Sequence, residues 1–256
     1  MSFNLQGPAG EEWVEEYDGP DPEASPLGRP LGDGVSLSCK DSSVSHNVSQ
    51  YPAFIHSLSS IRAHLACRST LQSFTDTSDA AVIIYGSPGS DISHNKVIAR
   101  TRSQMGGILM VDYGPWEGSY LDTVVSHNVI DALGGLIRVG IGIGPPVWSD
   151  DLDTTLRDGR VTDNILRGYW MGYGIVAASV SNFTVTDNLS TARHSGLRGS
   201  RCPTEPFENS PPMAFLFNQT STHGDIQQDF VGGSVQYGQS RSFLLASMFG
   251  LPVLVR

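Results

Sequence analysis

Lysine is almost missing from this chain of 256 residues, in which Lys40 and Lys96 are the only two. Charged residues make up 16% of the sequence, and the formal net charge is −10. Nucleic acids and anionic membrane surfaces bind clustered cations, so the composition predicts no nucleic acid and no membrane as a partner. Residues 1–35 hold eight acids against a single base, Arg29, and are rich in proline and glycine. We expect this segment to be a disordered arm.

Long hydrophobic runs are missing as well. No apolar stretch approaches the roughly 20 residues that a membrane-spanning helix needs. The first residues lack the basic and apolar regions of a signal peptide, so the sequence predicts no export signal. The three cysteines, Cys39, Cys67 and Cys202, lack the close spacing of a structural zinc site. They leave open one disulfide or three free thiols.

What the chain does contain is a repeated motif of four residues, [VI]-[ST]-[HD]-N. Its asparagines follow one another at intervals of 48, 33, 36 and 24 residues. Repetition at 20–50 residues is typical of solenoid proteins, in which one supersecondary unit stacks on the next. If one coil takes about 24 residues, the first interval spans two coils, and the intervals of 33 and 36 carry loop insertions. The motif ends at Asn47, Asn95, Asn128, Asn164 and Asn188.

The segments beside the motif favour strands over helices. Residues 82–86 are three β-branched residues followed by Tyr85 and Gly86, and residues 135–144 are rich in glycine and aliphatic residues, which alternate from residue 139 onward. Strict alternation is the period of a strand, and it places Ile137, Val139, Ile141 and Ile143 on one face. No long stretch with helical periodicity occurs. The sequence therefore predicts an all-β fold, a right-handed parallel β-helix.

Each position of the motif has a physical role in such a coil. We expect the aliphatic residue to point into the core and the serine or threonine to point outward. The third position falls at a tight bend, where Asn, Asp and His tolerate a left-handed backbone better than other residues. The asparagine then turns inward. Because stacked strands lie about 4.8 Å apart, the asparagines of successive coils can bond to one another and form a ladder.

These repeats resemble those of the pectin-lyase-like, right-handed parallel β-helix superfamily. Residues 107–120 and 139–144 more closely resemble a family of fungal β-helix proteins of unassigned function, and the likeness continues through residues 211–216. The resemblance implies β-helix coils over residues 36–192 and an irregular return segment with an apolar cap over residues 193–256. It also implies a secreted protein that acts on or binds polysaccharide or cell-wall material. Fold alone does not fix function.

Two insertions are candidates for a carbohydrate site, because both mix aromatic residues with carboxylates. The loops at residues 112–122 and 145–153 are expected to flank a groove. Paired carboxylates serve as general acid and base in glycoside cleavage, so Asp112 or Glu117 would act with Asp150 or Asp151. The run Asp150, Asp151 and Asp153 can also hold a calcium ion, although no other cofactor and no metal are predicted. The residues expected to contact substrate are Tyr113, Trp116, Tyr120, Arg138 and Trp148.

Other interpretations remain open. The loop aromatics can instead anchor each loop to the solenoid, and the whole protein can be a non-catalytic scaffold. A third possibility is an isomerase or cyclase for a small metabolite, with Trp116, Trp148, Tyr169 and Trp170 in a closed pocket. The catalytic segments of the superfamily's known hydrolases and lyases are not found. Three further features are ambiguous. Gly140, Gly142 and Gly144 form an outward face that either a ligand or a packed loop covers, and His46, His94 and His127 are either metal ligands or bend residues. Asn182 or Asn218 would carry any glycan.

Overall fold

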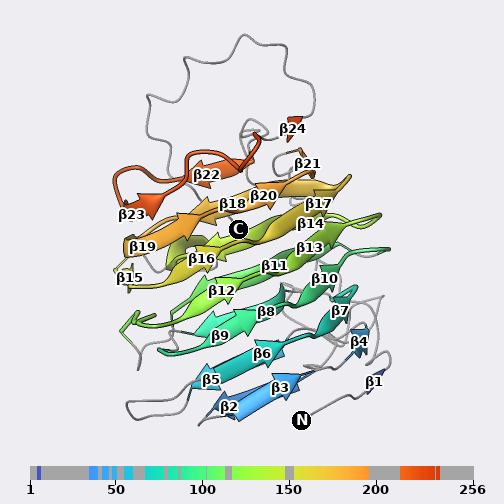
Figure 1. Ribbon diagram of the computed structural model, residues 1–256, viewed down its shortest axis with the longest axis horizontal. Helices are drawn as coiled ribbons and strands as arrows, with labels where there is room; N and C mark the ends of the chain where they lie inside the picture. The colour runs from blue at the N-terminus through green and yellow to red at the C-terminus, as the bar shows by residue number, and fades with distance from the viewer. Residues whose placement is uncertain are drawn as a thin grey trace, which may run out of the picture.

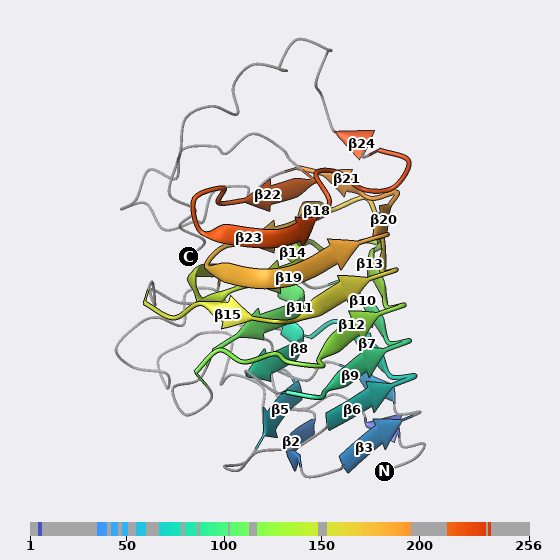
Figure 2. The same cartoon turned by 60° about the vertical axis from the view of Figure 1, so that its left-hand side comes forward.

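The computed structural model describes a stack of short strands that rises from the N-terminal to the C-terminal part of the chain (Figure 1). The described residues are 5–6, 35–39, 42–45, 48–50, 55–59, 67–77, 80–85, 88–101, 103–112, 117–147, 153–195, 214–233 and 235–236. Within them the strands form three sheets, here called A, B and C, and neighbouring strands in every sheet run parallel. The chain passes through A, then B, then C, and returns to A one level higher (Figure 2).

The bounds of the strands follow the spatial order of each sheet. Sheet A contains β3 (Ser42–Ser45), β6 (Cys67–Thr70), β9 (Asp91–Ser93), β12 (Val124–Ser126), β16 (Arg160–Thr162), β19 (Val180–Thr186), β15 (Leu156–Arg157) and β23 (Thr222–Ile226). Sheet B contains β1 (Leu5–Gln6), β4 (Val48–Gln50), β7 (Ser73–Thr75), β10 (Lys96–Ile98), β13 (Val129–Ala132), β17 (Ile165–Gly168) and β20 (Leu189–Ser190). Sheet C contains β2 (Val35–Cys39), β5 (Ile55–Ser59), β8 (Ala80–Tyr85), β11 (Gln104–Val111), β14 (Ile137–Ile143), β18 (Met171–Ala177), β21 (Arg193–His194), β22 (Phe215–Phe217) and β24 (Val235–Gln236).

This architecture confirms the predicted all-β fold, a parallel β-helix. The described residues contain no α-helix, and a short 3-10 helix, η4 (Pro145–Val147), follows β14. The stack also extends further than the predicted 36–192, since β22 and β23 pair with β18 and β19. At the other end, β1 pairs with β4, so part of the predicted N-terminal arm joins sheet B. Of the predicted arm, residues 5–6 and 35 are described, and of the predicted return segment and cap, residues 193–195, 214–233 and 235–236 are described.

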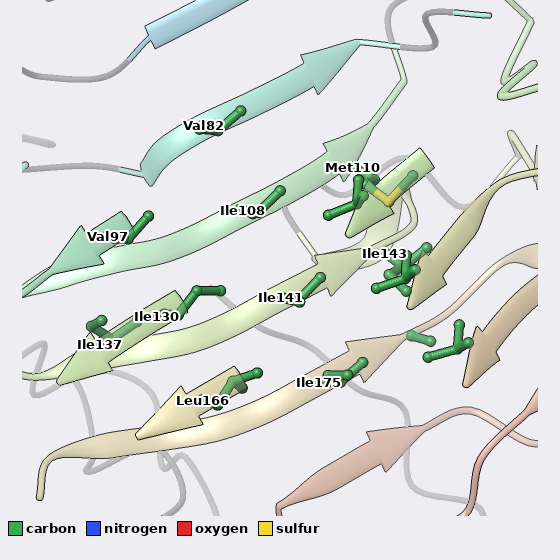
Figure 3. Close-up of a cluster of buried hydrophobic side chains, with 14 of the residues drawn as sticks. Val82, Val97, Ile108, Met110, Ile130, Ile137, Ile141, Ile143, Leu166 and Ile175 are labelled. Carbon is green, nitrogen blue, oxygen red and sulfur yellow. The ribbon is translucent and has the colours of Figure 1, made fainter. Parts of the chain in front are cut away.

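The core consists of aliphatic columns, one residue per coil. On sheet C, Val82, Ile108, Ile141 and Ile175 stand in register (Figure 3). All four are at most 1% exposed. Burying one such side chain contributes about 1.5–3 kcal/mol, so the column is a main source of cohesion between coils. A second column on sheet B contains Val97, Ile130 and Leu166.

The face assignment predicted for residues 137–143 is only partly right. Ile137, Ile141 and Ile143 belong to the core inside the coils, whereas Val139 packs with Leu109, Val147, Tyr173 and Val176 on the other side of sheet C. Strand β14 therefore does not alternate regularly, and its two faces cannot be read from the glycine spacing.

Contrary to the prediction, the three glycines in and directly after β14 do not share one outward face. They are Gly140, Gly142 and Gly144. A Cβ on Gly140 would meet the core side chain of Leu166 at 2.6 Å, so Gly140 faces inward. A Cβ on Gly142 would meet Val147 of η4 at 2.8 Å. At Gly142 the neighbour is thus a packed loop, one of the two predicted alternatives.

The asparagine ladder is present. The side-chain amide of Asn95 donates to Oδ1 of Asn128 at 3.0 Å, and Asn128 and Asn164 continue the series at 2.9 Å each, as far as Asn188. Each Oδ1 also accepts the backbone N–H of the asparagine before it in the series, at 2.9–3.1 Å. All four residues are at most 1% exposed. Asn47, the predicted first member, lies outside the described residues.

The bend before each ladder residue has the expected left-handed backbone. The φ angles are 57° at His94, 55° at His127, 57° at Asp163 and 60° at Asp187. Leu71 has the same conformation, with φ 57°, and the next residue, Gln72, donates its backbone N–H to Oδ1 of Asn95. Residues 67–75 therefore form the coil hidden in the interval of 48, as predicted.

Candidate functional site

The first predicted loop is only partly described. Asp112 is half-buried, and its Oδ1 accepts a hydrogen bond from the backbone N–H of Gly118 at 2.9 Å. Glu117 is exposed and has φ 52° in the turn that this bond closes. The other members of the predicted site, Tyr113, Trp116, Trp148, Asp150 and Asp151, lie outside the described residues. The pairing of two catalytic carboxylates therefore stays a prediction.

Tyr120 was predicted to contact substrate, and its position excludes that role. Its side chain is fully buried, and its hydroxyl lies 2.5 Å from the carbonyl oxygen of Ile84 and 2.6 Å from that of Val111. The ring packs against Phe183, with 6.0 Å between centroids. Tyr120 therefore anchors the loop to the solenoid.

The outer face of sheet C gives the predicted groove little room. Leu109, Val139 and Val176, which lie on the strands beside both loops, are at most 2% exposed. A trough for a polysaccharide needs open surface, so it does not run along these residues. A groove elsewhere beside residues 112–122 and 145–153 stays a prediction.

The described residues provide a complete set of ligands for neither predicted metal site, the histidine column or the calcium site at residues 150–153. The described residues contain no group of three or more His, Cys, Asp or Glu side chains placed to hold an ion. The rings of His94 and His127 stack, with 5.0 Å between centroids and 3° between planes. Because the nitrogen lone pairs of an imidazole lie in its ring plane, parallel rings do not converge on one metal. Asp153 is exposed, and the other two residues of the predicted calcium site are not described.

Exposed apolar side chains gather on one side of the molecule. Of the nine large hydrophobic residues that are exposed in the described part of the chain, seven lie on sheet B or at the turns into and out of it, and an eighth, Met105, lies at the start of β11 on the adjoining sheet C. Only Leu121 lies at the turn between sheets C and A. A concentrated apolar surface of this kind is typical of a binding site. The eight residues are Leu71, Met105, Leu133, Ile165, Tyr169, Trp170, Leu189 and Val231.

Two of these residues are aromatic neighbours at the turn from β17 to β18. Tyr169 is 59% exposed and Trp170 is 44% exposed. Their backbone is held in place by the coil below, since Tyr169 donates its N–H to Ala132 and the carbonyl oxygen of Trp170 accepts from Ile137, both at 2.9 Å. The guanidinium carbon of Arg193 lies 5.4 Å from the centroid of the Tyr169 ring, within the range of a cation–π contact. The turn thus presents aromatic surface on a fixed backbone.

Arginines lie along the border between sheets B and C, at and below the level of these aromatics. We call this border the B–C edge and define it as the described residues 98–101, 103–105, 131–138, 167–171 and 191–193. It holds four arginines and a single acid, Asp131, which is 7% exposed and forms an ion pair with Arg167 at 2.8 Å. The chain as a whole has a net charge of −10, so the edge is a local cationic exception. The four arginines are Arg100, Arg138, Arg167 and Arg193.

A buried polar pair near the C-terminal end was not predicted. Ser190 Oγ and His194 Nε2 are joined by a hydrogen bond of 2.9 Å, and the ring of His194 stacks on Phe230 at 5.8 Å. The Nδ1 atom of His194 finds no hydrogen-bond partner in the described part of the chain. Burial lowers the pKa of His194 from 6.5 to about 4, although the charge of Asp229 opposes this shift.

The pair resembles a nucleophile and its base in geometry, but not in access. Ser190 is 6% exposed and His194 is 0% exposed, and they occupy the core positions that Leu166 and Met171 hold one coil below. A substrate cannot reach them in this conformation, so we assign the pair to the core at the end of the solenoid.

Comparison with known proteins gives no match: no family model, no curated protein and no solved structure matches the chain. No helix in the described ranges is long and apolar enough to span a membrane. The resemblance to the pectin-lyase-like superfamily thus stays an expectation from sequence. Arg138 belongs to both the predicted site and the B–C edge, and Tyr169 and Trp170 were named in the sequence only for the small-metabolite alternative.

Proposed function

We propose that this protein is carbohydrate-directed and binds a glycan at the B–C edge. The observation that carries the proposal is the aromatic turn, where the consecutive residues Tyr169 and Trp170 are both exposed and Arg193 lies against the Tyr169 ring. Aromatic rings combine a large apolar face with a polar group, which suits the alternating apolar and hydroxyl surface of a sugar. The stacking and the hydrogen bonds would come from different parts of one rigid turn.

The arginines of the edge can supply directional hydrogen bonds. A guanidinium has five N–H donors and binds a carboxylate or a pair of hydroxyls in a fixed geometry. Arg193 is exposed, and Arg138 is half-exposed on the neighbouring strand β14. Both lie close to Trp170, whose backbone pairs with the start of β14. The fixed backbone keeps the ordering cost of binding low.

Cleavage of the glycan is a further part of the proposal and depends on the loops at residues 112–122 and 145–153. It requires two carboxylates about 5–9.5 Å apart on either side of the bound sugar. Asp112 is available as one of them, although its Oδ1 already accepts the N–H of Gly118. Binding at the edge does not need this second step, so the two can be tested separately.

A glycan array with the purified full-length chain tests binding. The variants Tyr169→Ala and Trp170→Ala should each weaken binding at least tenfold, the effect of losing about 1.4 kcal/mol of contact. Leu121→Ala is the matched control, because Leu121 is 55% exposed but lies at the turn between sheets C and A. Binding that is unaffected by both aromatic variants would place the site elsewhere, and no binding to any glycan would remove the proposal.

Hydrolysis or elimination products in the same samples test catalysis. Asp112→Asn should abolish product formation and leave binding unchanged if the loop carboxylates act as acid and base. The small-metabolite alternative is less well supported, because Tyr169 and Trp170 lie on the open surface and not in a closed pocket. The scaffold alternative gains support from the exposed apolar residues of sheet B, which include more than the aromatic turn.

A further inference from the structure

The first turn from sheet B to sheet C contains the most acidic part of the sequence. Strand β1 lies at the N-terminal end of sheet B, and β2 lies at the same end of sheet C (Figure 1). Residues 7–34, which connect these strands, lie outside the described residues, and we call them the acidic segment. They hold eight acids against Arg29 alone, so their formal charge is −7 (eight acids minus one base). The acidic segment therefore starts and ends at the border that the higher coils cross at the B–C edge.

The B–C edge carries the opposite charge. It holds four arginines and a single acid, Asp131, which already pairs with Arg167. Arg100 and Arg193 are exposed, and neither forms an ion pair with another residue in the described part of the chain. On a chain with a net charge of −10, these cations are a local site of attraction for anionic groups.

The acidic segment also matches the edge in its aromatic residues. Trp13 and Tyr17 stand between acids in the sequence of the segment. At the edge, the rings of Tyr169 and Trp170 are exposed, and Arg193 lies against the first of them. Aromatic rings attract one another and attract guanidinium groups. The surface that suits a sugar therefore also suits a peptide of this composition.

The acidic segment is long enough to reach every arginine of the edge. Six levels separate β1 from β20 in sheet B, which is about 29 Å at about 4.8 Å per level. The segment has 28 residues, and half of them can span about 46 Å at about 3.3 Å per residue. The segment can thus extend to the level of Arg193 and return to β2 without crossing sheet A.

We propose that the acidic segment binds the B–C edge of its own chain and competes there with the glycan. The competition rests on the proposed function, whereas the contact between segment and edge does not. Attachment at both ends keeps the segment at a high effective concentration, so ion pairs that are individually weak are sufficient to bind it. A glycan has to displace the segment, which lowers the apparent affinity of the glycan.

Modification of arginines by phenylglyoxal tests the contact in the full-length chain without any glycan. In a variant with four Glu→Gln substitutions in the acidic segment, Arg100 and Arg193 should react at least about threefold faster than in the parent chain, as mass spectrometry of the labelled peptides measures. Arg160, which is exposed on sheet A, is the internal control and should react equally in both proteins. The variant combines Glu11→Gln, Glu12→Gln, Glu15→Gln and Glu16→Gln.

A matched variant removes the same number of charges from exposed positions outside the edge. In this variant the labelling of Arg100 and Arg193 should stay at the level of the parent chain. Equal labelling of the parent and the segment variant would overturn the proposal, as would an equal increase in both variants. Protection that grows with protein concentration would overturn it too, because the segment would then bind another copy. The matched variant combines Asp122→Asn, Asp163→Asn, Asp187→Asn and Asp225→Asn.

Glycan binding by the same three proteins tests the competition. We expect the segment variant to bind a glycan at least about threefold more tightly than the parent and the matched variant do. Faster labelling together with an unchanged glycan affinity would overturn the competition. If none of the three proteins binds a glycan, the proposed function fails, whereas faster labelling still supports the contact between segment and edge.

Discussion

Gln227 accepts hydrogen bonds from both the backbone N–H and the side-chain amide of Asn188, at 3.0 and 2.9 Å. In the same way, the side-chain oxygen of each upper asparagine in the ladder accepts the backbone N–H and the side-chain amide of the asparagine below it. The longer glutamine side chain reaches the same place from the end of β23, one coil after the last motif. Its own amide donates to the carbonyl oxygens of Asn188 and Asp229. The ladder therefore ends on a residue whose polar groups are paired.

The ladder is expected to be a main determinant of stability. Asn128→Ala removes the acceptor of the Asn95 backbone N–H, which is buried, and the donor to the carbonyl oxygen of Ile92. An unpaired buried polar group costs about 1–3 kcal/mol, so the free energy of unfolding should fall by roughly 3 kcal/mol. Urea unfolding measures this change. Gln219→Ala, at an exposed position, is the control and should have no effect; a loss below about 1 kcal/mol in Asn128→Ala would contradict the role of the ladder.

Much of the fold could be predicted because the motif has one physical reason at each position. The left-handed bend restricts which residue types suit the third position, and the buried stack of amides restricts which suit the fourth. The motif does not reveal Gln72 and Gln227 as ladder residues, because each occupies the ladder position of its coil without the motif sequence around it. Leu71 even takes the left-handed bend itself, at φ 57°. A search for the motif finds the residues best suited to each position, whereas the backbone also accepts less suited ones.

The candidate site was less predictable, because face assignments depend on local bends in the strands. Val139 and Gly140 show this most clearly: regular alternation assigns their faces the wrong way round, and only the packing of Leu166 and Tyr173 reveals the irregularity. The exposure of Tyr169 and Trp170 depends on what covers the turn, and no local pattern encodes that. The Ser190–His194 pair becomes meaningful only when register places it above Leu166 and Met171.

Leu71 offers a substitution that should stabilise the protein. A left-handed backbone costs a residue other than glycine, asparagine or aspartate about 1–2 kcal/mol, and Leu71 is also 50% exposed. Leu71→Asn should therefore raise the free energy of unfolding by about 1 kcal/mol. Leu133→Asn is the control, since Leu133 is 49% exposed and is not among the positive-φ residues. Equal effects of the two variants in urea unfolding would show that the backbone angle is not responsible.

The stability of the C-terminal coils should depend on pH through His194. Its pKa is about 4 in the folded protein because of burial, against an ordinary histidine pKa of 6.5. Between these two values the unfolded chain binds a proton that the folded chain does not, so a falling pH favours unfolding. We expect stability to be fully present above pH 6.5 and to decrease by about 3 kcal/mol as the pH falls to 4.

Thermal unfolding at a series of pH values measures this dependence. His194→Met, which places in the coil the residue found one level below, should remove the His194 contribution between pH 6.5 and 4. His223→Met is the matched control, because His223 is exposed and should leave the profile unchanged. If the profile of His194→Met keeps the same slope as that of the parent, the dependence has another source.

Gly144 is the position where a single methyl group should be most harmful. Its φ is 113°, and a Cβ built there would overlap the carbonyl oxygen of Ala178 in the coil above. Both neighbours are fixed by backbone hydrogen bonds, since Gly144 donates to Met110 at 2.9 Å and Ala178 donates to Ile143 at 3.0 Å. The overlap can therefore be relieved only by separating two stacked coils, and we expect Gly144→Ala to cost more than about 3 kcal/mol.

Gly232 separates this effect from backbone strain alone. Its φ is 82°, also outside the usual range, but nothing lies within 4 Å of a Cβ built there. Gly232→Ala should thus cost only the strain of a positive φ, about 1 kcal/mol. The difference between the two variants in urea unfolding measures how closely neighbouring coils approach at Gly144. Equal losses would mean that the coils move apart without cost, and the solenoid would then be held together less tightly at this turn than its hydrogen bonds indicate.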